Sequence, residues 1–213
     1  MVNKTNVIQV LEEAEGRTIV AATKYTDVEG VNELVELGIN NIGENRVEAF
    51  LEKYDVLHDL DIVWHFIGHL QSKKVKKVID KIDYLHSLDR ISLAEEIQKY
   101  RKLPLKCFIE VNISNESSKS GLDLEEVSAF CANMAKYDKI VLVGLMGMAE
   151  LTDDGTIIES QFRKLSNLRD ELNETLGIDL QYLSMGMSND YKIAMRCGAT
   201  HLRLGSILFR NEE

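Results

Sequence analysis

A lysine at the end of an apolar run is the first residue of this sequence that could do covalent chemistry. The run Thr18-Ile19-Val20-Ala21-Ala22-Thr23 is short, apolar and partly β-branched, which predicts a buried strand that ends at Lys24. A lysine at the inner end of such a strand is costly to desolvate unless it has a partner or a role. Two interpretations stay open. Lys24 turns to solvent or meets a carboxylate, or it is a reactive amine that forms an imine with a carbonyl ligand.

Two stretches near the end of the chain combine glycine with serine and could hold a phosphate group. Gly186-Met187-Ser188-Asn189-Asp190 is expected to open a helix, where unpaired N–H groups favour an anion. Gly205-Ser206 adds close backbone approach and a hydroxyl. Ser188 could equally be an ordinary helix N-cap. A lysine at one end of a cavity and a phosphate site at the other would suit a phosphorylated aldehyde.

These residues need a scaffold, and the alternation of strand-like and helix-like segments predicts one. Consecutive strands separated by helices require parallel pairing with right-handed crossovers. We therefore expect an α/β fold, a single (β/α)8 TIM barrel over residues 1–213 with an additional N-terminal helix, and a doubly wound open sheet is the alternative. The expected strands are 18–24, 39–43, 62–67, 84–88, 105–113, 140–146, 179–183 and 201–205.

The helical segments carry apolar residues at spacings of three and four. Among them are a capped helix over 27–38, a lysine-rich helix over roughly 71–80 and a helix over 188–197. No full helix follows the last strand, so the N-terminal helix over 5–15 is expected to cover that gap.

Polar residues interrupt the apolar runs where the predicted strands end, which is the working face of such a barrel. Asn45 follows the second strand, His65 lies in the third and Arg203 in the eighth. Buried polar residues often only satisfy backbone groups, so each alone is weak evidence. Their common placement at the strand ends is what indicates a site.

Composition limits the partners. A net charge of −10 argues against nucleic acid or an anionic membrane as the main partner. No apolar run approaches the length of a membrane span, and the N-terminus lacks the apolar core of a signal peptide. Cys107, Cys131 and Cys197 are odd in number and far apart, which favours reduced thiols in a cytoplasmic protein.

Three further patterns have ordinary explanations. His65 and His69 lack a third ligand nearby, so we expect no metal site. The lysine run 73–81 indicates a solvated helix face, with a docking surface as the alternative. The methionines of the predicted strand ends are either barrel core or a wall of the ligand pocket, namely Met146, Met148, Met185 and Met187.

Several short motifs run through nearly the whole chain in a characteristic order. The most specific are Trp64-His65-Phe66-Ile67-Gly68 and Ser184-Met185-Gly186-Met187-Ser188. Together these motifs resemble the YggS/PROSC family of pyridoxal phosphate homeostasis proteins, which is similar to the barrel domain of bacterial alanine racemase. The other motifs are Ala22-Thr23-Lys24, Ile42-Gly43-Glu44-Asn45, Val111-Asn112-Ile113-Ser114, Ser118-Lys119-Ser120-Gly121, Gly144-Leu145-Met146 and Arg203-Leu204-Gly205-Ser206.

This resemblance implies a protein that binds pyridoxal 5′-phosphate (PLP). It implies a role in intracellular vitamin B6 homeostasis as a carrier or buffer, without an established catalytic activity. Apo PLP-dependent enzymes would be the recipients, and the protein would be a monomer or a weak dimer.

The resemblance also implies roles for single residues. Lys24 would form the imine, and Arg203 would face the pyridine nitrogen. The remaining positions divide into a phosphate-binding group, Ser188, Gly205 and Ser206, and a pocket-lining group, Asn45, His65 and Met185. The sequence departs from the family pattern at Tyr25, Arg46 and Arg210, where proline, tyrosine and glycine are usual. These departures concern rim contacts and the end of the chain.

An amino-acid racemase that uses the same cofactor is the alternative function, and a purely structural barrel is a third. Racemisation needs a second acid or base opposite Lys24. The end of the chain at Glu213 predicts that no further domain supplies one. Arg203 stays protonated and cannot share its proton with the ring nitrogen, which weakens the ring as an electron sink. We therefore expect a carrier.

Overall fold

Eight parallel strands pair in sequence order and close into a barrel in the computed structural model, which describes residues 1–114 and 120–209. β8 pairs with β1, with Arg203 opposite Val20, and this pairing closes the sheet. The predicted TIM barrel is confirmed, and the alternative of an open doubly wound sheet is wrong. The strands are β1 (Thr18–Ala22), β2 (Asn41–Glu44), β3 (Val63–Phe66), β4 (Tyr84–Leu88), β5 (Leu105–Glu110), β6 (Ile140–Met146), β7 (Tyr182–Ser184) and β8 (His201–Leu204).

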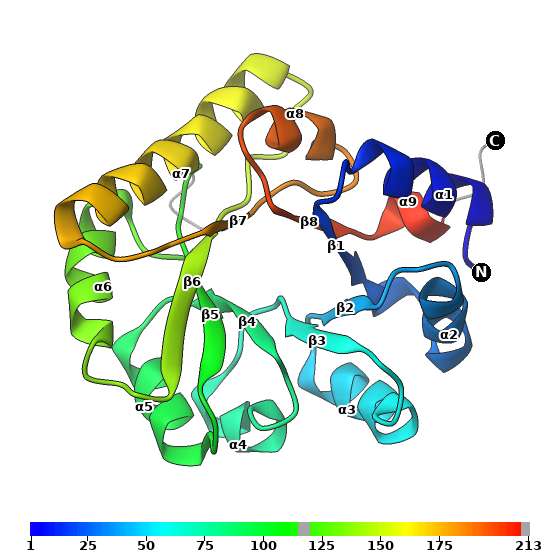
Figure 1. Ribbon diagram of the computed structural model, residues 1–213, viewed down its shortest axis with the longest axis horizontal. Coiled ribbons are helices and arrows are strands. Elements are labelled where there is room, and N and C mark those ends of the chain that lie inside the picture. The colour runs from blue at the N-terminus through cyan, green and yellow to red at the C-terminus, as the bar shows by residue number, and fades with distance from the viewer. Residues whose placement is uncertain (115–119, 210–213) are drawn as a thin grey trace.

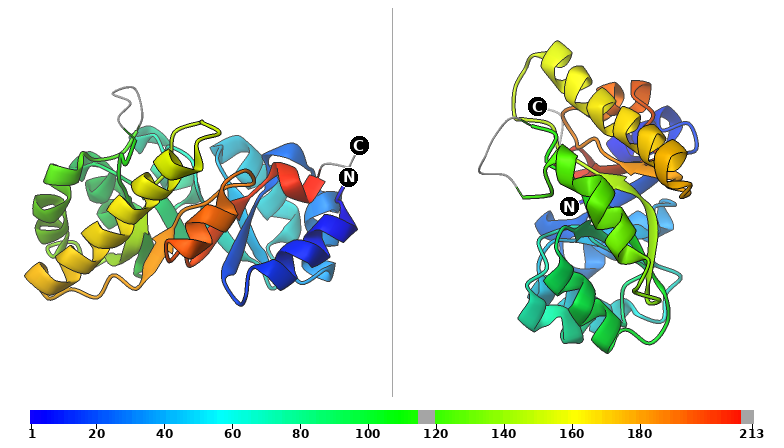
Figure 2. Two further views of the ribbon diagram at one scale, coloured as in Figure 1. Left: turned by 90° about the horizontal axis from the view of Figure 1, so that it is seen from above. Right: turned by 90° about the vertical axis from the view of Figure 1, so that its left-hand side faces the viewer.

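Helices follow the strands and lie around the outside of the barrel (Figure 1). Asp27 caps the helix after β1 by accepting a hydrogen bond from the N–H of Gly30 at 3.1 Å, as the sequence predicted. The longest helix, α7, lies next to α8 in both views of Figure 2. These helices are α2 (Val28–Glu36), α3 (Val47–Leu57), α4 (Val75–Val78), α5 (Ile91–Tyr100), α6 (Val127–Met134), α7 (Gly155–Leu176) and α8 (Tyr191–Arg196).

The N-terminal helix α1 (Lys4–Glu13) packs against the single turn α9 (Ser206–Phe209) that follows β8 (Figure 1). The N–H of Asn3 donates to the carbonyl of Leu208 at 2.8 Å, and the side-chain amide of Asn6 donates to the carbonyl of Ile207 at 3.0 Å. The expected absence of a full final helix, with α1 covering the gap, is confirmed for the described residues.

Several element boundaries differ from the prediction. β1 ends at Ala22, and Thr23–Tyr25 forms the 3-10 turn η1. The lysine-rich helix is reduced to the turn η2 (Ser72–Lys74) and the one-turn α4. It ends because the N–H of Lys81 donates to Val78, closing a tight turn. α8 begins only at Tyr191, after a loop over 185–190.

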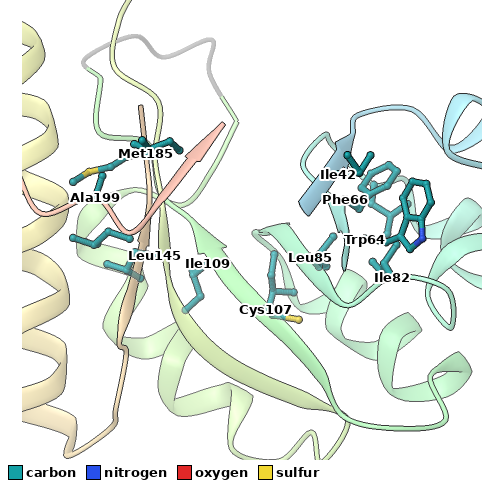
Figure 3. Packing of buried hydrophobic residues seen from close by; sticks show 14 of the residues in the cluster. Ile42, Trp64, Phe66, Ile82, Leu85, Cys107, Ile109, Leu145, Met185 and Ala199 are labelled. Carbon is teal, nitrogen blue, oxygen red and sulfur yellow. The ribbon is translucent and has the colours of Figure 1, made fainter. Parts of the chain in front are cut away.

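The barrel has two kinds of packing. Apolar side chains, aliphatic and aromatic, fill the space between the strands and the helices, and Figure 3 shows part of this cluster, with the register partners Ile109 on β5 and Leu145 on β6. Inside the barrel, aromatic rings from strands on opposite sides meet. His65 on β3 lies 6.3 Å from His201 on β8 and stacks on Tyr84 at 4.7 Å, both between ring centroids. The interior is therefore lined by rings with polar atoms, which can form hydrogen bonds across it.

The described ranges contain no helix that is both long enough and apolar enough to cross a membrane. Cys107, Cys131 and Cys197 are buried, and none forms a disulfide.

Candidate functional site

A cavity of about 820 Å³ opens where β1, β6, β7 and β8 end. This is the face of a barrel at which loops gather functional groups. Of the predicted site residues, the cavity brings together Lys24, Ser188, Arg203, Gly205 and Ser206. The other lining residues belong to the turn after β1 and to the loops after β6 and β7, and they include Tyr25, Met148, Glu150, Asp153, Met187 and Asp190.

Lys24 lies at the mouth of the cavity in the turn η1, and its side chain is exposed. Its Nζ lies 4.6 Å from the centroid of the Tyr25 ring, a cation–π contact. The interpretation that Lys24 turns to solvent agrees with this exposure, because the strand ends before Lys24 and the buried position falls to Thr23. An exposed amine that faces a cavity can meet an incoming carbonyl group without first breaking an ion pair.

The opposite side of the cavity is formed by the loops after β7 and β8. Ser188 Oγ accepts hydrogen bonds from the N–H groups of Gly205 at 3.1 Å and Ile207 at 3.3 Å. Ser188 is therefore not the N-cap of α8, a position that Asp190 occupies. With its lone pairs engaged, the Ser188 hydroxyl has its proton left to donate to a ligand.

Further donors lie in the same two loops. Among the described residues, none accepts a hydrogen bond from the backbone N–H of Asn189 or Ser206. These N–H groups and the Ser188 and Ser206 hydroxyls can all donate, which is what an anionic group such as a phosphate needs.

Arg203 forms the polar floor of the cavity. Its Nη1–H donates to Ser184 Oγ at 2.7 Å and its Nη2–H donates to the carbonyl of Gly147 at 3.2 Å. Burial lowers the pKa of Arg203 to about 10, and the carboxylates of Glu110 and Asp190 oppose this shift. The guanidinium remains charged at neutral pH and is held in a fixed orientation.

A chain of hydrogen bonds runs from Arg203 into the barrel interior. Ser184 Oγ contacts His86 Nδ1 at 2.8 Å, and His86 Nε2 contacts His65 Nδ1 at 2.9 Å. His65 Nε2 then contacts Asn41 Oδ1 at 2.9 Å. No sequence signal predicts this chain, because directly bonded members of it lie up to 98 residues apart.

The direction of the chain follows from Asn41, whose side-chain oxygen can only accept. His65 must therefore carry its proton on Nε2, and His86 must donate from Nε2 to His65. Burial lowers the pKa of both histidines well below the usual value, so both are neutral. Ser184 is then the donor to His86, while Arg203 donates to Ser184.

The structure separates Asn45, His65 and Met185 from the cavity lining. His65 reaches the cavity only through His86, Ser184 and Arg203. Met185 is fully buried in the core. Asn45 is partly buried, and its Oδ1 has no hydrogen-bond partner within the described ranges.

The four methionines that were expected in either the barrel core or the pocket wall are divided between these two places. Met148 and Met187 line the cavity, whereas Met146 and Met185 are buried.

Sequence reasoning gave Asp190 no role of its own within the predicted phosphate stretch, and it missed the loop over 149–153 as part of the site. Asp190 Oδ1 accepts from the N–H of Met187 at 2.6 Å, and burial raises the pKa of its carboxyl group. Its place two residues after Ser188 was the available signal. The loop after β6 carried no comparable signal, because its residues fit any exposed turn.

The remaining predictions concern residues outside the cavity. In the described ranges no group of three or more potential ligands could hold a metal ion. In the lysine run, Lys74 pairs with Glu48 at 2.7 Å, and Lys81 lies 4.4 Å from the ring centroid of Tyr54. Ser118, Lys119 and Arg210 lie outside the described residues.

The closed parallel barrel with a lysine, an arginine and a serine-containing loop around one cavity defines a barrel of the alanine racemase type. The family described as alanine racemase, N-terminal domain, matches residues 4–212, and the chain belongs to this family. Its curated relatives are pyridoxal phosphate homeostasis proteins. The protein of Aquifex aeolicus is 39% identical over 194 residues, which cover 90% of this chain and 85% of the relative. That of Schizosaccharomyces pombe is 36% identical over 209 residues, covering 94% and 87%.

Solved structures agree with this assignment, and the predicted family is confirmed. PipY of Synechococcus elongatus with PLP bound has a TM-score of 0.88 and 27% identity, covering 98% of this chain and 100% of that chain. PipY without PLP has a TM-score of 0.90 and 28% identity, covering 97% and 99%. Alanine racemase of Clostridium difficile shares the fold, with a TM-score of 0.78 and 16% identity, and this chain covers 58% of it.

Proposed function

We propose that the protein binds PLP in the cavity at the ends of β1, β6, β7 and β8 and takes part in vitamin B6 homeostasis as a carrier. The observation that supports this most is the placement of Lys24, Arg203 and Ser188 around one cavity. The related PipY, which has a PLP-bound structure, and the names of the curated relatives point the same way.

The side chains around the cavity suit the chemical groups of PLP. The primary amine of Lys24 would hold the aldehyde carbon as an imine, with loss of water. Ser188, Gly205 and Ser206 would hold the phosphate through hydroxyl and N–H donors. Arg203 would face the ring nitrogen as a fixed donor, because its own proton does not leave at neutral pH.

His65, Met185 and Asn45 would serve the site without lining it. His65 would fix Arg203 through the chain of His86 and Ser184. Met185 would support the loop after β7 from below, since its N–H donates to the carbonyl of His201 at 3.1 Å. Asn45 lies where β2 ends, and its unpaired Oδ1 would be free to accept a hydrogen bond there.

The bound cofactor supplies an aldehyde that exchanges between amines, and the protein's residues decide how it is held and released. Lys24 lies exposed at the mouth, so the cofactor can leave toward apo PLP-dependent enzymes, its expected recipients. The three unpaired thiols suit a reducing compartment such as the cytoplasm.

The visible absorption spectrum of the purified protein with PLP tests the proposal. We expect an imine band in the wild type and its loss in Lys24→Ala, because no other lysine lines the cavity among the described residues. Lys74→Ala is the matched control, since it removes a half-buried lysine of the turn η2, outside the cavity, and should keep the band. A wild-type spectrum without an imine band would contradict the proposal.

The phosphate site is tested separately with pyridoxal, which lacks the phosphate. Hydrogen bonds to charged groups contribute about 1.5–3 kcal/mol each, so losing two of them should weaken binding by at least two orders of magnitude. Calorimetric titration of both forms into Lys24→Ala measures this without the imine. Equal affinity for the two forms would refute the assignment of Ser188 and Ser206.

A further inference from the structure

The turn that carries Lys24 is fixed by a buried group of charges behind it. Lys53 on α3 and Glu44 at the end of β2 form an ion pair, and their side chains are 7% and 0% exposed. Removing a charged pair from water is costly, so stability alone does not explain why this pair is kept in the core.

Both partners of the ion pair also hold Thr23, the residue directly before Lys24. Lys53 Nζ donates to the carbonyl of Thr23 at 2.8 Å, and Thr23 Oγ1 donates to Glu44 Oε1 at 2.6 Å. The N–H of Thr26 donates to the same Thr23 carbonyl at 3.1 Å and closes the turn. The peptide that leads into Lys24 is therefore held through both its carbonyl and its side chain.

The contrast between the turn and the side chain that it carries is informative. Thr23 is fully buried and has these fixed partners, while Lys24 is exposed and its amine lies over the ring of Tyr25. Most of the freedom of the Lys24 amine thus lies in its own side chain, and the direction in which this side chain leaves the backbone is set by Thr23, Glu44 and Lys53.

We propose that Lys53 and Glu44 are positioning residues that aim Lys24 at the carbonyl carbon of the ligand. This inference rests on the proposed function, because it concerns the imine at Lys24. Neither residue lines the cavity. The ion pair therefore acts on the geometry of attack and not on the affinity of the phosphate loops, which lie on the other side of the cavity.

Two ligands distinguish an effect on the geometry of attack from an effect on the affinity of the phosphate loops. PLP reports on imine formation, and pyridoxine 5′-phosphate, which carries an alcohol in place of the aldehyde, reports on the phosphate and ring contacts alone. Lys53→Met removes the charge and both hydrogen bonds. Lys53→Arg restores a cation beside Glu44, and Lys74→Met is a control for loss of a lysine that pairs with a glutamate at the surface.

We expect Lys53→Met to form the imine at Lys24 more slowly by roughly tenfold to a hundredfold, the cost of a small misplacement of a reacting group. Binding of pyridoxine 5′-phosphate should stay within about twofold of wild type, Lys53→Arg should regain part of the rate, and Lys74→Met should match wild type. Stopped-flow absorbance measures the rate of imine formation, and calorimetry measures the affinity for pyridoxine 5′-phosphate. If Lys53→Met does not fold, Thr23→Val carries the test, since it removes the hydroxyl that donates to Glu44 at 2.6 Å and to the carbonyl of Gly43 at 3.3 Å, and it should slow imine formation in the same selective way.

The outcomes separate this inference from the proposed function. A wild-type chain that forms no imine overturns both. A wild-type imine together with an unchanged rate in the folded variant, Lys53→Met or Thr23→Val, overturns the positioning role alone. Equal losses for PLP and pyridoxine 5′-phosphate would also overturn it, because they would indicate general damage to the barrel.

Discussion

At the scale of single residues, the barrel interior depends on histidines that stay neutral. His65 and His86 belong to the hydrogen-bond chain that leads to Arg203, and His201 packs edge-on against Phe108 and Tyr182. Burial lowers the pKa of all three, and that of His201 to about 4. Protonating any of them in the folded state would place an uncompensated charge near Arg203.

These shifts give the protein an acid-sensitive stability with a defined sign. In the folded state His201 binds its proton only near pH 4, whereas in the unfolded chain it does so near 6.5. Between these values the unfolded state binds more protons, so stability falls as the pH falls. Each buried histidine should contribute up to about 1.4 kcal/mol per pH unit across this window.

Urea unfolding between pH 7 and 4.5 measures the effect. His201→Phe keeps an aromatic ring. It should lower the number of protons taken up on unfolding by about one, which is read from the slope of the unfolding free energy against pH. His58→Gln, which replaces an exposed histidine, is the control variant. An unchanged slope in His201→Phe would show that His201 is not held neutral by the barrel.

At the scale of elements, the site depends on how closely β6 approaches β7. A Cβ atom at Gly144 on β6 would lie 2.0 Å from the carbonyl oxygen of Tyr182 on β7, so only glycine allows this pairing. Two residues further along β7, Ser184 accepts the hydrogen bond from Arg203. The backbone contact thereby fixes the strand that orients the arginine.

Gly144→Ala should force the two strands apart and destabilise the fold by roughly 1–3 kcal/mol, as overpacking does. Gly155→Ala at the start of α7 is the matched control, because its new Cβ would lie 3.5 Å from Ile193 Cδ1, an ordinary contact. Chemical denaturation of both variants compares the unfolding free energies. Similar values for the two would contradict the close approach of β6 and β7.

The same elements show what sequence can and cannot predict. Apolar periodicity located all eight strands and the lysine at the first strand end, because burial and chain alternation are local signals. It extended the first strand as far as Lys24, since the bonds that hold Thr23 after the end of β1 come from Glu44 and Lys53, 20 or more residues away. The family resemblance grouped His65 with the pocket, whereas its inward direction depends on its register with Gly43 and Tyr84 and on its hydrogen bond to Asn41.

At the scale of the whole molecule, two features support the proposed role as a carrier rather than an enzyme. Arg203 is protonated, buried and bonded to Ser184 and Gly147, so it cannot hand a proton to the ring nitrogen. Lys24 at the open mouth favours exchange of the cofactor with other amines. We therefore expect a loaded protein to restore an apo PLP-dependent enzyme.

The racemase alternative makes the opposite prediction for single-enantiomer amino acids. Incubation of the loaded protein with L-alanine, followed by chiral chromatography, should show turnover far below the order of 1 s⁻¹ that is common for enzymes. Racemisation at or above that rate, abolished in Lys24→Ala, would replace the carrier assignment with an enzymatic one.

The most direct test of the account is to identify the lysine that binds PLP. Borohydride reduction of the loaded wild-type protein, followed by peptide mass spectrometry, converts the imine to a stable label on the residue that formed it. We expect the label on Lys24 and not on the exposed lysines of the run 73–81, such as Lys73 and Lys76. A label on any other lysine, with Lys24 unmodified, would contradict it.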